Sequence, residues 1–195
     1  MEQPAFLKQL KFATGNLKKL EEARSILRQP LIQVSLELEE VQTCDVETAA
    51  RHKAEAAFRQ LGEPVLVEDS GLVINAWNGL PGALVKWFEN TVGLAGMARM
   101  LDGFESREAV AQCLVALHDG RRVLVARGEV TGEIAPSPRG NAGFGWDVLF
   151  IPQGEKRTFA EMSSQEKNAI SHRRHAFTAM QRLLDGPLGQ GRKIL

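Results

Sequence analysis

The sequence predicts an α/β protein with a mixed β-sheet, and three patterns lead to this prediction. A short apolar run at Leu10–Ala13 is followed by a tight turn and a helical pattern over residues 17–28. Between residues 109 and 134, apolar runs flank Asp119-Gly120, a pair suited to a hairpin turn. A Ser-x-x-Glu capping box at Ser163 opens a last helical pattern that reaches about Leu184. A strand–helix unit and an antiparallel hairpin together indicate a mixed sheet flanked by helices.

The other elements follow from periodicity and from glycine and proline positions. Residues 34–39 alternate with period two and predict a strand, and a helix is expected over residues 46–61. Residues 65–67 predict a buried strand, and residues 148–151 another. The final residues, 186–195, resemble a loose tail.

Composition excludes several classes of protein. The 195 residues, 44% of them apolar, suffice for one compact domain or for two lobes that share a core. Lys plus Arg and Asp plus Glu both total 24, so nothing indicates a nucleic-acid-coating protein. Cys44 and Cys113 lack metal-ligand spacing and are expected to be structural thiols in a reducing compartment. With no long apolar stretch, the chain is predicted to be cytoplasmic and to have no membrane partner.

The turn after the first strand has the features of an anion-binding site. A strand–turn–helix unit leaves the first N–H groups of the helix unpaired, and the helix dipole adds positive charge there. Gly15 allows a close approach, Asn16 is a good N-cap, and Lys18 or Lys19 could reach a phosphate. An ordinary turn with two solvated lysines is the alternative. The spacing of a Walker loop is absent.

Carboxylates occur where a metal ion could bind. Continuing the alternation of residues 34–39 places Glu40 on the apolar side of that strand, so it either ends the strand or faces a metal site. Glu68 and Asp69 follow a buried apolar run and precede Gly71, which predicts acids at a strand end entering a glycine turn. Mg²⁺ binds carboxylates together with substrate phosphates. Solvated loop acids are the alternative.

The C-terminal third contains a glycine-flanked aromatic pair. Phe144 and Trp146 lie among glycines, and Asp147 follows them, a combination that suits a nucleobase or, alternatively, a loop anchored by core aromatics. Arg173 falls inside the apolar stripe of the last helix and needs a partner there. In one continuous helix Lys167 would lie about 120° from Arg173, so both could face one ligand only if the helix bends. Lys86 could meet an anion, or be a surface lysine.

Four motifs in order make the chain resemble the inosine triphosphate pyrophosphatases. They are Phe-Ala-Thr-Gly-Asn-Leu-Lys-Lys-Leu-Glu-Glu at residues 12–22, Val-Glu-Asp-Ser-Gly-Leu at 67–72 with Gly-Leu-Pro-Gly at 79–82 and Lys-Trp-Phe at 86–88, Phe-Gly-Trp-Asp at 144–147 with Ala-Glu-Met at 160–162, and Glu-Lys-Asn-Ala-Ile-Ser-His-Arg at 166–173. The Trp in Phe-Gly-Trp-Asp is more similar to the eukaryotic-type branch.

The resemblance implies a two-lobed fold around a long mixed sheet, with residues 1–185 as one nucleotide pyrophosphohydrolase domain and the active-site cleft between the lobes. It implies a homodimer that uses Mg²⁺, with Mn²⁺ as a substitute, to convert ITP, dITP and XTP to the monophosphate and pyrophosphate. Asp69 would activate water, Lys19 would neutralise phosphate charge, and Glu40 and Asp69 would be the metal-associated acids. The implied substrate-binding residues are Thr14, Gly15, Asn16, Leu17, Lys18, Lys19, Asp69, Ser70, Lys86, Phe144, Gly145, Trp146, Asp147, Lys167, His172 and Arg173.

Some assignments stay open at this point. The substrate lysine that the family often has in its second helix falls on His52, with Lys53 one place later, and Glu39 competes with Glu40. A regulator that binds nucleotides without catalysis and a small kinase are the rival functions, and the missing Walker spacing disfavours the kinase.

Overall fold

A mixed sheet forms the axis of the protein in the computed structural model, which describes residues 8–27 and 30–186. Within these residues the sheet has seven strands in the order β2-β1-β3-β5-β6-β7, and β4 pairs with β3. The strands are β1 (Leu10–Ala13), β2 (Leu31–Val34), β3 (Val65–Ile74), β4 (Pro81–Gly82), β5 (Glu108–His118), β6 (Val123–Ile134) and β7 (Phe150–Pro152). β1 pairs in parallel with β2 and β3, and the other pairs are antiparallel. The α/β class with a mixed sheet is confirmed.

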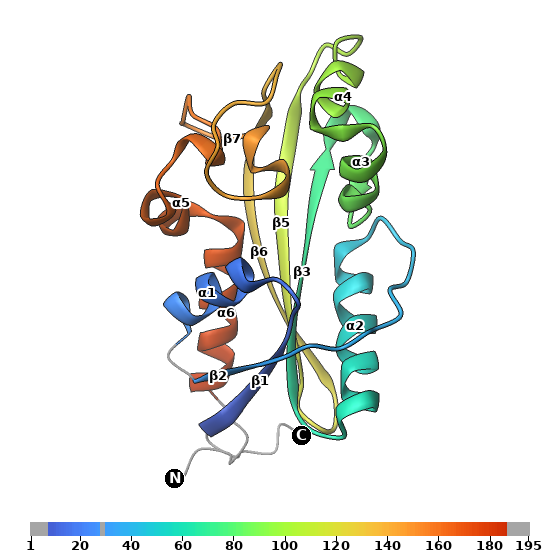
Figure 1. The fold of residues 1–195 in the computed structure, drawn as a ribbon, viewed down its shortest axis with the longest axis vertical. Coiled ribbons are helices and arrows are strands. Elements are labelled where there is room, and N and C mark those ends of the chain that lie inside the picture. The colour runs from blue at the N-terminus through green and yellow to red at the C-terminus, as the bar shows by residue number, and fades with distance from the viewer. Residues whose placement is uncertain (1–7, 28–29, 187–195) are drawn as a thin grey trace.

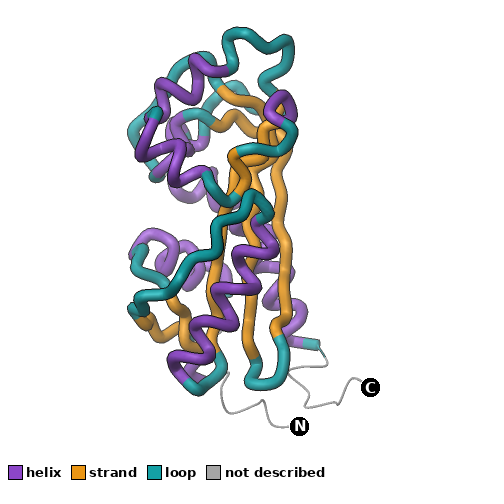
Figure 2. Tube along the Cα trace, turned by 90° about the vertical axis from the view of Figure 1, so that its right-hand side faces the viewer, coloured by secondary structure: helices purple, strands orange, loops and turns teal. Residues whose placement is uncertain are grey.

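Helices pack at both ends of this long sheet (Figure 1). The α-helices are α1 (Leu17–Ile26), α2 (Val46–Leu61), α3 (Val85–Thr91), α4 (Gly93–Met100), α5 (Ser164–Ile170) and α6 (His172–Asp185), and the short 3₁₀ turns are η2 (Asn75–Trp77), η3 (Gly145–Val148) and η4 (Phe159–Glu161). One group, α1, α2 and α6, lies at the end that contains β1 and β2, and another group, which includes α3 and α4, lies at the opposite end. Strands β3, β5 and β6 run through both groups, and Figure 2 shows the elongated two-lobed outline that results. None of the helices among the described residues is both long and apolar enough to cross a membrane.

The lower lobe in Figure 1, which contains β1 and β2, has helices on both faces of the sheet. On one face α1 and α6 bury Leu20 and Phe177 against Phe12. On the other face α2 presents Ala50, Ala54 and Ala57, whose small side chains let the helix lie close to the strands. Asp45 caps α2 by accepting from the Thr48 amide at 2.8 Å, and Gly62 ends the helix in the left-handed region.

The upper lobe has its own apolar cluster. Leu72 and Ile74 at the far end of β3 pack with Met97 of α4, Phe150 and Phe159. Since β3 and β5 contribute residues to the clusters of both lobes, the lobes share one continuous sheet.

Two predicted strands differ from the structure. The strand over residues 34–39 is wrong, because β2 ends at Val34, opposite the last residue of β1, Ala13, and has no ladder partner beyond it. The strand over residues 148–151 begins only at Phe150, because residues 145–148 form η3.

Two predicted helices also differ from the structure. The helix over residues 17–28 ends at Ile26, and Arg28 lies outside the described residues. The last helix is two helices: the capping box of Ser163 and Glu166 begins α5, and Ser171 then caps α6 by accepting from the Arg174 amide at 3.1 Å. The predicted tail, apart from Gly186, lies outside the described residues.

Candidate active site

The turn between β1 and α1 is stabilised by its own side chains. Asn16 Oδ1 accepts from the backbone N–H groups of Lys18 at 3.0 Å and Lys19 at 3.3 Å, and Thr14 Oγ1 accepts from the Asn16 amide at 3.1 Å. Asn16 is therefore the expected N-cap. Two of the amides that seemed open to an anion are already paired, so the cationic side chains contribute more of the positive charge at this turn.

The two lysines of this turn point in different directions. Lys19 Nζ lies 2.7 Å from Glu68 Oε2. Lys18 Nζ instead donates to the carbonyl oxygen of Gly143 at 2.8 Å and so connects α1 to the loop before η3. Leu17 is 62% exposed. Of these three residues, only Lys19 lines the main cavity described below.

Glu68 and Asp69 lie in the middle of β3. The prediction that they leave a strand end at a glycine turn is wrong, because β5 pairs with β3 along its whole length from Val65 to Ile74. Gly71 serves close packing, since a Cβ atom there would lie 2.8 Å from the carbonyl carbon of Gly82. Alternation in the strand buries Glu68 and leaves Asp69 partly accessible.

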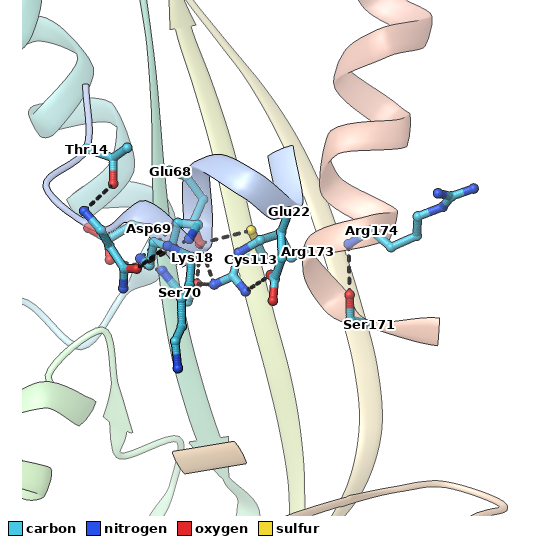
Figure 3. A network of polar contacts seen from close by, with 12 residues as sticks. Thr14, Lys18, Glu22, Glu68, Asp69, Ser70, Cys113, Ser171, Arg173 and Arg174 are labelled. Carbon is cyan, nitrogen blue, oxygen red and sulfur yellow. Dashed lines mark hydrogen bonds and ion pairs between the residues drawn. The ribbon is translucent and has the colours of Figure 1, made fainter. Parts of the chain in front are cut away.

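Glu68 is the centre of a buried polar network (Figure 3). Besides Lys19, Glu68 accepts from Arg173 at 3.2 Å, from Ser70 Oγ, and from the Cys113 thiol at 3.3 Å. Burial alone would raise the pKa of Glu68, but the charges of Arg173 and Lys19 hold it well below its usual value. Burial, followed by the Glu68 charge, raises the pKa of Cys113 well above its usual value. Glu68 is therefore ionised and Cys113 is a thiol.

The break between α5 and α6 brings Lys167 and Arg173 to the same partner. Arg173 lies 2.6 Å and Lys167 Nζ 3.4 Å from the Glu22 carboxylate of α1. The separation expected from one continuous helix is thus removed by the new helix start at Ser171. Arg173 is only 1% exposed, and its Nε has no hydrogen-bond partner among the described residues.

The loop of residues 144–147 folds around its aspartate. Asp147 Oδ2 accepts from the Phe144 amide at 2.8 Å and from Lys167 Nζ at 2.7 Å. Lys167 Nζ lies 4.7 Å from the centre of the Phe144 ring. The Trp146 ring lies 5.1 Å from that of His172. Burial, together with the nearby Arg173 and Lys167, lowers the pKa of His172 well below its usual value, so its imidazole is neutral.

Glu40, Asp69 and Lys53 form the third polar group. Lys53 Nζ lies 3.5 Å from Glu40 Oε1 and 3.6 Å from Asp69 Oδ2. Burial lowers the pKa of Lys53, but the charges of Asp69 and Glu40 outweigh it and the pKa is raised overall. In residues 8–27 and 30–186 no group of three or more His, Cys, Asp or Glu side chains is arranged to hold a metal ion.

One cavity of about 830 Å³ unites these groups. Both lobes line it. From the sequence-predicted set it contains Thr14, Gly15, Asn16, Lys19, Glu40, Asp69, Ser70, Lys86, Phe144, Gly145, Trp146, Asp147, His172 and Arg173. Leu17, Lys18 and Lys167 are not part of its lining. Lys53 lines the cavity where His52 does not, and Glu40 does where Glu39 does not.

Residues 10–183 match the model of the Ham1 family. The chain belongs to this family. It is 45% identical to the inosine triphosphate pyrophosphatase of Yarrowia lipolytica over 177 residues, covering 88% of this chain and 92% of the relative. It is 43% identical to the dITP/XTP pyrophosphatase of Methanopyrus kandleri, covering 85% and 90%. The yeast relative agrees with the expected likeness to the eukaryotic-type branch.

A solved Ham1 structure has the same fold. The HAM1 protein from Coxiella burnetii superimposes with a TM-score of 0.81 at 32% identity, covering 91% of this chain and 98% of that one. The two-lobed architecture around a long mixed sheet is therefore the architecture of the Ham1 family.

The contacts of several residues of this Ham1 site were not predicted from the sequence. In the sequence Glu22 cannot be told from a solvated acid on a helix, because its partners lie more than 140 positions away in the chain. Glu68 was grouped with Asp69 as a strand-end acid. Glu89 of α3 also lines the cavity, and nothing in the local pattern of residues 85–91 marks it. A signal existed for Lys53, which follows directly after the position that the resemblance aligned with a substrate lysine.

Proposed function

We infer that this protein hydrolyses non-standard purine nucleoside triphosphates, namely ITP, dITP and XTP, to the nucleoside monophosphate and pyrophosphate. The observation that carries this inference is the cavity, which has lysines beside the β1–α1 turn, two accessible carboxylates, and an aromatic loop with buried cations. The family relatives named inosine triphosphate and dITP/XTP pyrophosphatases support the same activity. The protein is a nucleoside triphosphate pyrophosphohydrolase.

The aromatic loop suits the purine. Phe144 lines the cavity with Lys167 and Arg173 near its ring, and neutral His172 lies against Trp146. Arg173 and Lys167 give this end positive charge and N–H donors, which suit a 6-oxo group and oppose the 6-amino group of adenine. In the structure both cations are paired with acids, so base binding would share or displace those hydrogen bonds.

The β1–α1 turn suits the triphosphate. Lys19, in the helix that follows this turn, lines the cavity, as do Lys53 of α2 and Lys86 of α3, and these lysines can neutralise charge that develops on the phosphates. Ser70 offers a hydroxyl on the same strand as Asp69. The outward positions of Leu17 and Lys18 give these two residues a smaller part in this proposal.

Glu40 and Asp69 would hold Mg²⁺, with Mn²⁺ as a substitute. The donor set fits, because Mg²⁺ in nucleotide enzymes uses one or two carboxylates and completes its coordination with phosphates and water. Lys53 lies between the two carboxylates, which indicates that this point stabilises positive charge. When bound, the ion would polarise the phosphoryl group.

Asp69 would accept the proton of the attacking water. The Ser70 amide donates to Asp69 Oδ1 at 2.9 Å and fixes the orientation of the carboxylate, and Oδ2 faces Lys53. Lys19 stays close to Glu68 and from there can stabilise the departing pyrophosphate.

The cellular setting is part of this proposal. We expect a cytoplasmic homodimer that binds neither nucleic acid nor membranes, in keeping with the balanced charge of the sequence.

Incubation with ITP, XTP, ATP and GTP tests the proposal, with monophosphate, pyrophosphate and orthophosphate measured separately. The expected result is monophosphate and pyrophosphate from ITP and XTP, and little reaction with ATP. Asp69→Asn should abolish turnover. Orthophosphate as the inorganic product, or full activity of the Asp69→Asn variant, would contradict it.

A further inference from the structure

Glu89 contributes an acceptor to the cavity that the proposed mechanism does not use. It lies in α3, in the upper lobe, and lines the cavity together with Gly145, Trp146 and Asp147. Its Oε1 atom is buried and has no hydrogen-bond partner among residues 8–27 and 30–186. A buried acceptor without a partner is costly, so a ligand that supplies a donor would be favoured at this point.

The Glu89 carboxyl group is held against the aromatic loop. A Cβ atom built on Gly145 would lie 2.8 Å from Glu89 Oε1, so the loop passes directly over this oxygen. The backbone of Trp146 also lies near the carboxyl group and lowers its pKa. Glu89 therefore packs against the same loop that is proposed to bind the base.

The charges around Glu89 leave its acceptor available. Burial raises its pKa, the Trp146 hydrogen bond lowers it, and the charge of Asp147 raises it further. Lys19 and Lys86 lower it without forming an ion pair with it in the described part of the chain. Neither lysine is bonded to Oε1, which lies buried beside Gly145, and Glu89 as a residue lines the cavity.

Purine bases differ in what they offer such an acceptor. A 6-oxo purine carries a proton on ring atom N1, whereas adenine presents a lone pair there. A carboxylate can accept from the first and only repels the second. We propose that Glu89 is a specificity-determining residue whose carboxylate accepts a hydrogen bond from N1–H of a 6-oxo purine and disfavours adenine. This proposal rests on the proposed function and adds a second point of base discrimination to the cationic one.

Glu89→Gln is the informative variant. Glutamine keeps the shape of the side chain but replaces one carboxylate oxygen by an NH₂ donor and removes the charge, so the carboxylate acceptor at the cavity is lost. Loss of a hydrogen bond to a charged group typically changes an equilibrium constant about tenfold or more. The kcat/KM ratio of ITP to ATP should therefore fall at least about tenfold. The dITP to ITP ratio should stay constant, because both nucleotides carry the same base.

Thr91→Ala serves as the matched control, since Thr91 lies in the same helix, contacts the Trp87 carbonyl and does not line the cavity. Melting temperatures of the variants monitor the fold. A purely structural role for Glu89 would lower activity towards ITP and ATP by the same factor, and that result would overturn the proposal. An unchanged ITP to ATP ratio in Glu89→Gln would also overturn it.

Nucleotide binding separates this proposal from the proposed function. If the wild-type protein releases no pyrophosphate from ITP, the hydrolytic function is wrong, and the dissociation constants of ITP and ATP are then compared by tryptophan fluorescence. A fall in the preference for ITP in Glu89→Gln supports the role of Glu89. Equal preference in wild type and variant refutes it.

Discussion

Replacing Glu68 by glutamine removes a buried negative charge that Lys19 and Arg173 share. The Glu68 side chain is 0% exposed and that of Arg173 is 1% exposed, so solvent cannot replace the lost charge. Removing one partner of a buried ion pair costs about 3–5 kcal/mol. Because Glu22 still pairs with Arg173 and Lys19 is 20% exposed, we expect the lower end, about 3 kcal/mol.

Urea denaturation at neutral pH measures this loss as a change in the free energy of unfolding. Glu63→Gln is the matched control, since Glu63 lies 2.6 Å from Lys11 but is 53% exposed. That exposed pair should contribute less than about 1 kcal/mol. A Glu68→Gln variant as stable as the Glu63→Gln variant would refute the account of the buried network. The folded pKa of Glu68 is depressed, so its contribution is present above the usual value of 4.5 and is lost as the pH falls below it.

Three further predictions concern the cavity. His172 has a lowered pKa, so folding is favoured above its usual value of 6.5, and stability should fall as the pH drops below that value. His172→Phe should remove this dependence in pH-resolved thermal melts, and an unchanged profile would contradict it. Lys19→Met should lower kcat for ITP by about 100-fold or more, as loss of a transition-state donor does, whereas Lys18→Met should cost far less. Equal kcat losses would show that the divergence of the two lysines is irrelevant to catalysis. Chelation of divalent ions should stop turnover, and Glu40→Gln should raise the Mg²⁺ concentration needed for half-maximal activity; an unshifted Mg²⁺ titration would exclude Glu40 from the metal site.

Local patterns were sufficient for the elements whose stabilising contacts are local. The Asn16 and Ser163 caps, the alanine-rich helix α2 and the turn at Asp119-Gly120 all appear as the sequence predicts. Their residues satisfy hydrogen bonds within a few positions, so a short window contains the information.

The errors arose where distant partners decide the structure. Residues 34–39 alternate like a strand, but β1 ends at Ala13, opposite Val34, and offers no partner to the residues after Val34. Glu68 and Asp69 precede a glycine, but β5 extends the strand past them. Ser171 is the N-cap of α6 and so ends the preceding helix, but the apolar periodicity continues across it and gives no sign of the break.

The sequence predicted which residues belong to the candidate site better than it predicted the contacts between them. Most of the residues predicted for the site line the cavity, including Glu40, although the strand argument for Glu40 was wrong. Glu22 was given no role, and Glu68 was predicted only as a strand-end acid near a metal ion, because both form ion pairs with cations far away in the chain. A charged residue that pairs across the fold carries no local signature.

The central claim is selective release of pyrophosphate from a 6-oxo purine nucleotide, and a competition measured by phosphorus NMR tests it most directly. Equimolar ITP and ATP are incubated together with the protein and Mg²⁺ while all phosphorus signals are followed. We predict that the ITP signals are replaced by IMP and pyrophosphate in equal amounts while ATP persists. Equal consumption of ATP, or conversion of ITP to IDP and orthophosphate, would contradict the account.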